Sequence, residues 1–129
     1  MSIWDEQNVL DHVLASLNSV PLVNDAHHFG RPWLSAYQLA IKVNELAPQV
    51  ATALGVTVGS RGTGSQTSLA QYLARELSRK IKADGSYPVE GAFLSNERVR
   101  AITYVGPDGD DLTSSLTGSG FDLSLFRRR

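Results

Sequence analysis

The chain has 129 residues, of which 42% are hydrophobic and 19% charged, and it contains no cysteine. This balance is typical of a folded protein, and the length fits one domain, 1–129, with its own hydrophobic core. The lack of cysteine excludes disulfides, thiolate zinc sites and cysteine nucleophiles. No apolar run reaches the roughly 18–20 residues that span a bilayer, and we see no signal peptide. We therefore expect a cytoplasmic protein that does not contact membranes.

The net charge of -1 is unevenly distributed along the chain. Residues 1–60 carry two basic and five acidic side chains, residues 61–100 seven basic and four acidic, and residues 101–129 three basic and four acidic. Positive charge is therefore concentrated in the middle segment and in the three arginines at 127–129. Those arginines fit a phosphate-contacting tail and a solubilising end equally well.

Two helical segments are expected in the first part of the chain. The first, about 3–18, follows the N-cap Ser2 and has apolar residues spaced to form one face. The second, about 35–54, follows Ser35 and carries a broad apolar arc, which indicates that it is nearly buried. Pro48 interrupts it, because proline cannot continue a helix but can begin the short last segment.

The third expected helix, about 68–83, is the most informative element. Ser68 and Gln71 have the spacing of a capping box, and an Asp-Gly pair ends the helix. Its apolar side chains fall within an arc of about 140° on a helical wheel. The opposite face presents Gln71, Arg75, Ser78, Arg79 and Lys82. Such donors suit phosphates and base edges, although an ordinary solvated face has the same composition.

After this helix the hydrophobic period changes from 3.6 to 2, which predicts strands. The expected strands cover about 87–94, 97–105 and 111–117, with a Gly-Pro-Asp-Gly turn at 106–109. The tail that follows has apolar anchors and is expected to pack on the domain. The fold class is therefore α+β, with a three-helix core followed by a small antiparallel β-sheet or hairpin.

The order of elements resembles that of the winged helix-turn-helix superfamily, in which three helices precede a strand pair. The stretch Ser-Ala-Tyr-Gln-Leu-Ala at 35–40 resembles the start of that superfamily's second helix. The resemblance implies that the third helix reads double-stranded DNA and that a hairpin around 87–105 forms the wing, with Arg98 and Arg100 near phosphates. On this interpretation the chain is a small DNA-binding regulator, and a homodimer is left open.

A glycine-rich segment, Gly-Ser-Arg-Gly-Thr-Gly-Ser at 59–65, precedes the third helix. Glycines let the backbone approach an anion closely, and Arg61 would add charge. The segment lacks the lysine of a Walker A loop. A loop that touches nucleic-acid phosphates is therefore preferred to a dedicated nucleotide site, and no cofactor is expected.

A second hypothesis is a protein-interaction module of the immunity, antitoxin or adaptor kind, without catalytic activity. Its basis is the near-zero net charge, the lack of a catalytic constellation, and four aromatic residues in segments that look irregular. Exposed together, such aromatics would form an anchor patch for a protein partner. The four residues are Phe29, Trp33, Phe121 and Phe126.

An enzyme has the least support. His27 and His28 lie near Asp25, and a histidine beside a carboxylate can serve as a base or bind a metal. No HExxH or Gly-x-Ser-x-Gly motif is present, and the aspartates around Gly109 lack the register of an EF-hand. We therefore expect no metal and no catalytic residue, and leave open whether the histidine pair lines a pocket.

Overall fold

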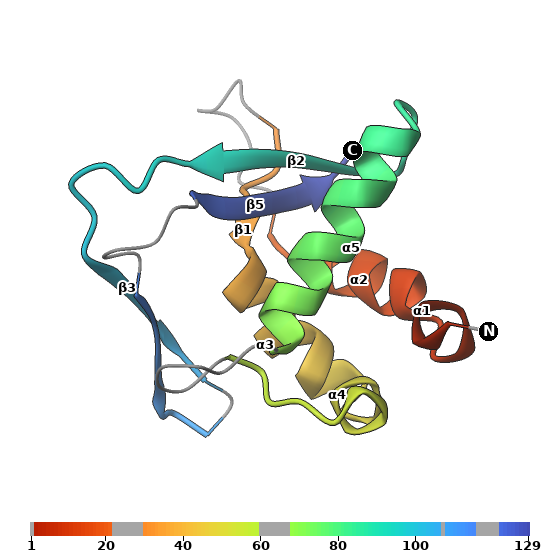
Figure 1. The fold of residues 1–129 in the computed structure, drawn as a ribbon, viewed down its shortest axis with the longest axis horizontal. Coiled ribbons are helices and arrows are strands. Elements are labelled where there is room, and N and C mark those ends of the chain that lie inside the picture. The colour runs from red at the N-terminus through yellow and green to blue at the C-terminus, as the bar shows by residue number, and fades with distance from the viewer. Residues whose placement is uncertain (1, 22–29, 60–67, 107, 116–121) are drawn as a thin grey trace.

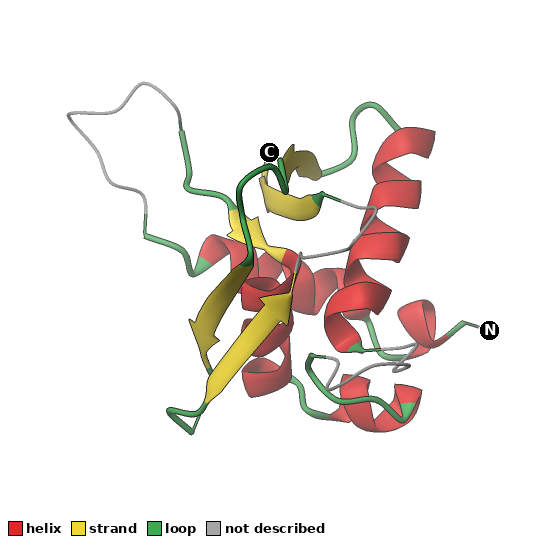
Figure 2. Cartoon of the chain, turned by 60° about the vertical axis from the view of Figure 1, so that its left-hand side comes forward, coloured by secondary structure: helices red, strands yellow, loops and turns green. Residues whose placement is uncertain are grey.

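The computed structural model describes residues 2–21, 30–59, 68–106, 108–115 and 122–129. Along the chain these segments form two helices, a short strand, three helices and four strands (Figure 1). The helices gather in one part of the molecule and the strands in another (Figure 2). The α+β class expected from the sequence is confirmed.

The segment expected to form one helix at 3–18 is divided into α1 (Ile3–Glu6) and α2 (Val9–Asn18). Asn8 separates them, because its backbone is left-handed with a φ of 52°, a conformation that asparagine adopts more readily than most residues. Ser2 is the N-cap of α1, where its hydroxyl accepts a hydrogen bond from the backbone N–H of Asp5.

The second expected helix is also divided, into α3 (Ala36–Leu46) and α4 (Gln49–Leu54). Ser35 and Gln38 form a reciprocal capping box at the start of α3, which satisfies two backbone N–H groups that no helical carbonyl can reach. Gly55 ends α4 with a φ of 70°, a left-handed cap that glycine adopts at little steric cost.

The third expected helix corresponds to α5 (Leu69–Ala83). Ser68 caps it by accepting a hydrogen bond from the backbone N–H of Gln71, at 3.1 Å between nitrogen and oxygen. One side of α5 is buried in the core against α3 and the sheet. The buried residues are Leu69, Ala70, Tyr72, Leu73 and Leu77. This burial fixes which side of the helix meets solvent.

The core is closed by a three-stranded antiparallel sheet of β1 (Leu34–Ser35), β5 (Leu123–Arg128) and β2 (Val89–Leu94), in that spatial order. β5 lies between its partners, and its Phe126, 1% exposed, packs in the core opposite Gly91. The sequence predicts that the tail packs on the domain, but not that it forms the middle strand. β1 is also unpredicted.

A second sheet is a hairpin of β3 (Ala101–Val105) and β4 (Asp111–Ser115). Its turn matches the expected turn signal, with the backbone N–H of Gly106 donating to the carbonyl of Asp110 at 2.7 Å. The prediction of a hairpin around 87–105 is wrong, because β2 pairs with β5 along its whole length and β3 pairs with β4.

The hairpin attaches to the helices by a small contact. Tyr104 of β3 stacks on Tyr37 of α3, with ring centroids 5.6 Å apart and planes inclined by 12°. Leu112 of β4 lies close to Gly59. A Cβ added at Gly59 would be 2.7 Å from Cδ1 of Leu112. The hairpin stands apart from the three-stranded sheet (Figure 1).

Candidate nucleic-acid interface

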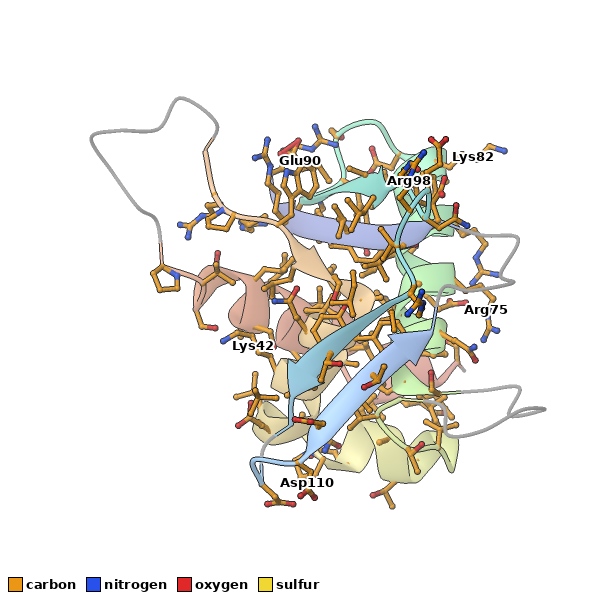
Figure 3. The ribbon with its side chains drawn as sticks, turned by 90° about the vertical axis from the view of Figure 1, so that its left-hand side faces the viewer. Lys42, Arg75, Lys82, Glu90, Arg98 and Asp110 are labelled. Atoms are coloured by element: carbon orange, nitrogen blue, oxygen red, sulfur yellow. The ribbon has the colours of Figure 1, made fainter. Side chains whose placement is uncertain are left out.

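The solvent-facing side of α5 carries the largest set of residues predicted to contact nucleic acid. All five side chains on this side are exposed: Gln71, Arg75, Ser78, Arg79 and Lys82. The side chains of Arg75 and Arg79 are 62% and 68% exposed. In Figure 3 Arg75 and Lys82 point away from the body of the protein. We call these five residues the α5 face.

Glu76 interrupts the positive charge of the α5 face. One of its carboxylate oxygens lies 2.5 Å from Nη2 of Arg79, and the other lies 4.0 Å from Nε of Arg75. Its side chain is only 12% exposed, so the carboxylate is the inner partner of two outer guanidinium groups. Spacing by three residues predicts such a pair on a helix.

α1 forms one border of the α5 face. Trp4 packs against Tyr72, with ring centroids 6.2 Å apart, and the ammonium group of Lys80 lies 4.8 Å from the Trp4 ring centroid. Burial raises the pKa of the Tyr72 phenol, and the Glu76 carboxylate raises it further. Lys80 therefore belongs to the contact between α1 and α5.

The other predicted contacts lie elsewhere in the molecule. Arg98 and Arg100 are exposed in the segment between β2 and β3, where Arg98 has a left-handed backbone with a φ of 60°. This segment follows the end of β2, on the opposite side of the molecule from the C-terminal end of α5 (Figure 1). The structure thus gathers five predicted residues on one helix and leaves two on a separate segment. Arg61 lies outside the described residues.

The arginines at 127–129 form neither a free tail nor a purely solubilising end. Arg127 donates to the carboxylate of Glu90 at 2.7 Å and lies with its guanidinium carbon 4.3 Å from the Trp33 ring centroid. Arg128 and Arg129 donate to main-chain carbonyls just before β2. These side chains fasten β5 to its neighbours.

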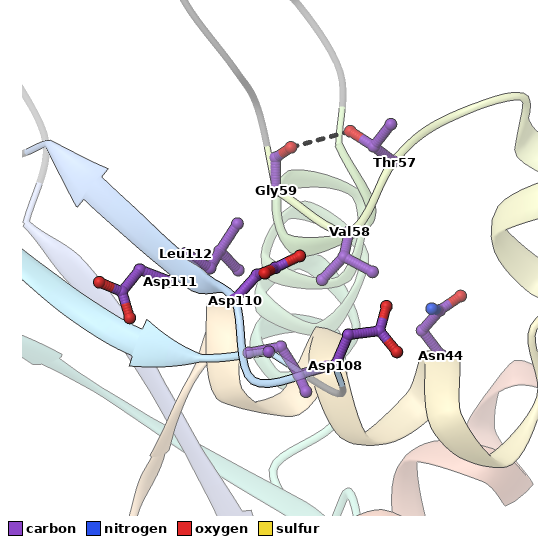
Figure 4. Close-up of a pocket in the computed structure, with 10 residues that line it drawn as sticks. Asn44, Thr57, Val58, Gly59, Asp108, Asp110, Asp111 and Leu112 are labelled. Carbon is purple, nitrogen blue, oxygen red and sulfur yellow. Dashed lines mark hydrogen bonds between the residues drawn. The ribbon is translucent and has the colours of Figure 1, made fainter.

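A pocket of about 350 Å³ lies between α3, residues 57–59 and the turn of the β3–β4 hairpin (Figure 4). Asp108, Asp110 and Asp111 give it a negative charge, and Asp108 points toward Asn44 of α3. Among the residues that the structure describes, no group of three or more histidine, cysteine or acidic side chains could hold a metal ion. The acidic pocket thus has the opposite charge to the α5 face.

Two of the four aromatic residues predicted to form an anchor patch lie in the described segments. Phe126 is buried in the core, and Trp33 is half-buried beside Arg127. The other two, Phe29 and Phe121, lie outside the described residues. The histidine pair at 27–28, on which the enzyme hypothesis rests, also lies outside them. The two aromatics that are described therefore serve the fold rather than an exposed patch.

The chain matches no protein-family model, and it has no significant match among curated proteins or solved structures. Within the described segments, no helix has the length and apolar character needed to cross a membrane.

Proposed function

We propose that this protein is a nucleic-acid-binding module, of winged-helix type, that places the α5 face against double-stranded DNA. The observation that carries the proposal is the division of α5 into two sides. One side is buried in the core, whereas the other presents three cationic and two uncharged hydrogen-bonding side chains to solvent. The 15 residues of α5 extend roughly 22 Å at 1.5 Å per residue. A major groove about 12 Å wide admits an α-helix.

The chemistry of the α5 face suits a duplex. Lysine and arginine neutralise phosphates and release counterions, which makes affinity depend strongly on salt. Arginine can also donate two hydrogen bonds to guanine, and glutamine can pair with adenine in the major groove. The face therefore combines groups that position a protein on the backbone with groups that can distinguish bases.

The surrounding elements support the winged-helix interpretation. Three longer helices, α2, α3 and α5, precede the strands β2 and β5, and Arg98 follows the end of β2. In this proposal the segment from β2 to β3, together with the β3–β4 hairpin, takes the place of a wing. Arg98 and Arg100 then contact phosphates beside the groove that α5 enters.

The test is fluorescence anisotropy of a labelled random duplex, titrated with the protein at low and near-physiological salt. We expect saturable binding with a steep salt dependence, lost when Arg75, Arg79 and Lys82 are all replaced by alanine. Lys42→Ala, which removes one cation from α3, should be compared with Arg79→Ala and should change affinity much less. Absence of binding at low salt would refute the proposal.

A protein-interaction module is the second candidate, because Phe93 on the edge strand β2 is 69% exposed. Large exposed apolar side chains are typical anchors of protein interfaces. Sedimentation at increasing concentration would test the simplest case, self-association. A rise in molecular mass that Phe93→Ser abolishes would favour this candidate, and a constant monomer mass would count against self-association through this strand.

A further inference from the structure

Glu76 holds an unusual position for a surface that binds a polyanion. It lies beside the centre of the α5 face, and its carboxylate contacts Arg79 at 2.5 Å and approaches Arg75 to 4.0 Å. A carboxylate at this place repels phosphate and takes up an N–H group of the guanidinium that a phosphate could otherwise use. A helix selected only for strong attachment to any duplex would have no use for it.

The exposed fractions of the three side chains show which member of each ion pair is free to move. Glu76 is 12% exposed, whereas Arg75 and Arg79 are 62% and 68% exposed. The guanidinium groups can therefore turn toward solvent while the carboxylate stays against the helix. Exchange of the inner carboxylate for an outer phosphate needs only rotation of long side chains, and no backbone movement.

On the basis of the proposed function, we infer that Glu76 is a competitor built into the α5 face, which holds Arg79 in the free protein and must be displaced by phosphate. This competition lowers the affinity for any duplex by the same factor. The ratio of specific to random affinity is therefore unchanged. Glu76 instead weakens attachment to random DNA, so that stable binding needs a site that also offers base contacts to the rest of the face.

The direct test is Glu76→Gln, which keeps the size of the side chain and removes its charge. We expect affinity for a random duplex to rise about three- to tenfold at low salt, and the salt slope to become steeper by about 0.9, the value for one additional phosphate contact. Glu45→Gln is the matched control, because it removes one exposed carboxylate from α3. It should change the affinity by less than about twofold.

A second pair of variants separates competition from simple repulsion. In an Arg79→Ala background, Glu76→Gln should have less than about twofold effect, because the guanidinium that it releases is missing. The same gain in both backgrounds would show that Glu76 acts by long-range charge alone and would overturn the inference. Thermal unfolding of each variant confirms that the proteins compared are folded.

The two proposals fail in different ways. If the unaltered protein binds duplex and Glu76→Gln binds equally or more weakly, the inference is overturned and the proposed function stands. If the unaltered protein, Glu76→Gln and Glu45→Gln all fail to bind at low salt, the proposed function is overturned and the inference with it.

Discussion

The α5 face and the acidic pocket at the β3–β4 turn are both polar surfaces, but the fold supports them differently. Beneath the α5 face, Leu69, Leu73 and Leu77 are fully buried in the main core. The hairpin is attached mainly by the stacking of Tyr104 on α3 and by Leu112 against the 57–59 segment. A recognition surface needs fixed side-chain positions, and α5 meets that need better than the hairpin.

The two surfaces also differ in charge. The α5 face has Arg75, Arg79 and Lys82, whereas the pocket has three aspartates near residue 109. With a net charge of only -1, the protein as a whole neither attracts nor strongly repels a polyanion. The separation of charges can therefore orient the protein, so that an approaching polyanion meets α5 first.

The largest effect is expected from Leu73→Ala, beneath the α5 face. Removing a fully buried leucine side chain leaves a cavity and should lower the free energy of unfolding by about 2–5 kcal/mol. Leu112→Ala, in the half-buried hairpin contact, should cost less. Urea denaturation of both variants measures the difference. Equal losses would show that the hairpin is as firmly anchored as α5.

Charge changes on the two surfaces should separate them in binding. Arg79→Glu reverses a charge on the α5 face and should lower duplex affinity roughly 10- to 100-fold at low salt, about 1.4–2.8 kcal/mol. Asp110→Asn removes a charge at the pocket and should leave affinity within about twofold. Anisotropy titration measures both constants. A larger effect of Asp110→Asn would place the interface at the hairpin.

Gly59→Ala tests the close contact between the hairpin and the helical part. The added methyl would lie 2.7 Å from Cδ1 of Leu112, so the leucine must move, and we expect a loss of stability of about 1 kcal/mol. The Gly59→Ala/Leu112→Ala double variant should lose less than the sum of the single losses. Additive losses in urea denaturation would contradict the contact.

Tyr104→Phe should leave stability unchanged or raise it by up to about 1 kcal/mol. The Tyr104 hydroxyl is buried and has no hydrogen-bond partner among the described residues, so its removal ends an unfavourable burial. The stacked ring remains. Thermal unfolding measures the change, and a clear loss of stability would indicate that the hydroxyl has a partner in the folded protein.

The smallest effect concerns alkaline pH. Burial raises the pKa of the Tyr37 phenol, with the neighbouring Tyr104 adding to the rise, and burial also raises the pKa of Tyr72. Their neutral forms are favoured in the folded state, so stability is complete below about pH 10, the unfolded value, and falls as pH rises above it. The ultraviolet absorbance of phenolate should show that these tyrosines ionise at a higher pH than a free tyrosine does. Ionisation at or below pH 10 would contradict this.

Local sequence signals were sufficient for the helices of the core and for one hairpin. The amphipathic period placed α5 within about a residue of its bounds, because that pattern persists over 15 residues. The same period continued through Asn8, so it concealed the break between α1 and α2. β1 has only two residues, and the partner of β2 lies about 30 residues further along the chain. No local pattern specifies such pairings.

The candidate site was predictable to a similar extent. The helical wheel identified the exposed residues of α5, because burial of one side of a helix determines which side meets solvent. The contact of Glu76 with Arg79 follows the three-residue spacing, but the low exposure of Glu76, 12%, depends on tertiary packing that the sequence does not reveal. The engagement of the arginines at 127–129 could not be predicted, because it requires the position of β5 between β1 and β2.

The position of β5 has a consequence for synthesis of the chain. β1 and β2 do not pair with each other, and the strand between them is made last among these elements. On the ribosome, α2, α3 and α5 emerge first, while the apolar surface that Phe126 will cover stays open. A nascent chain stalled before Leu123 would present unpaired strands to chaperones, and the sheet would close only after the final strand had emerged.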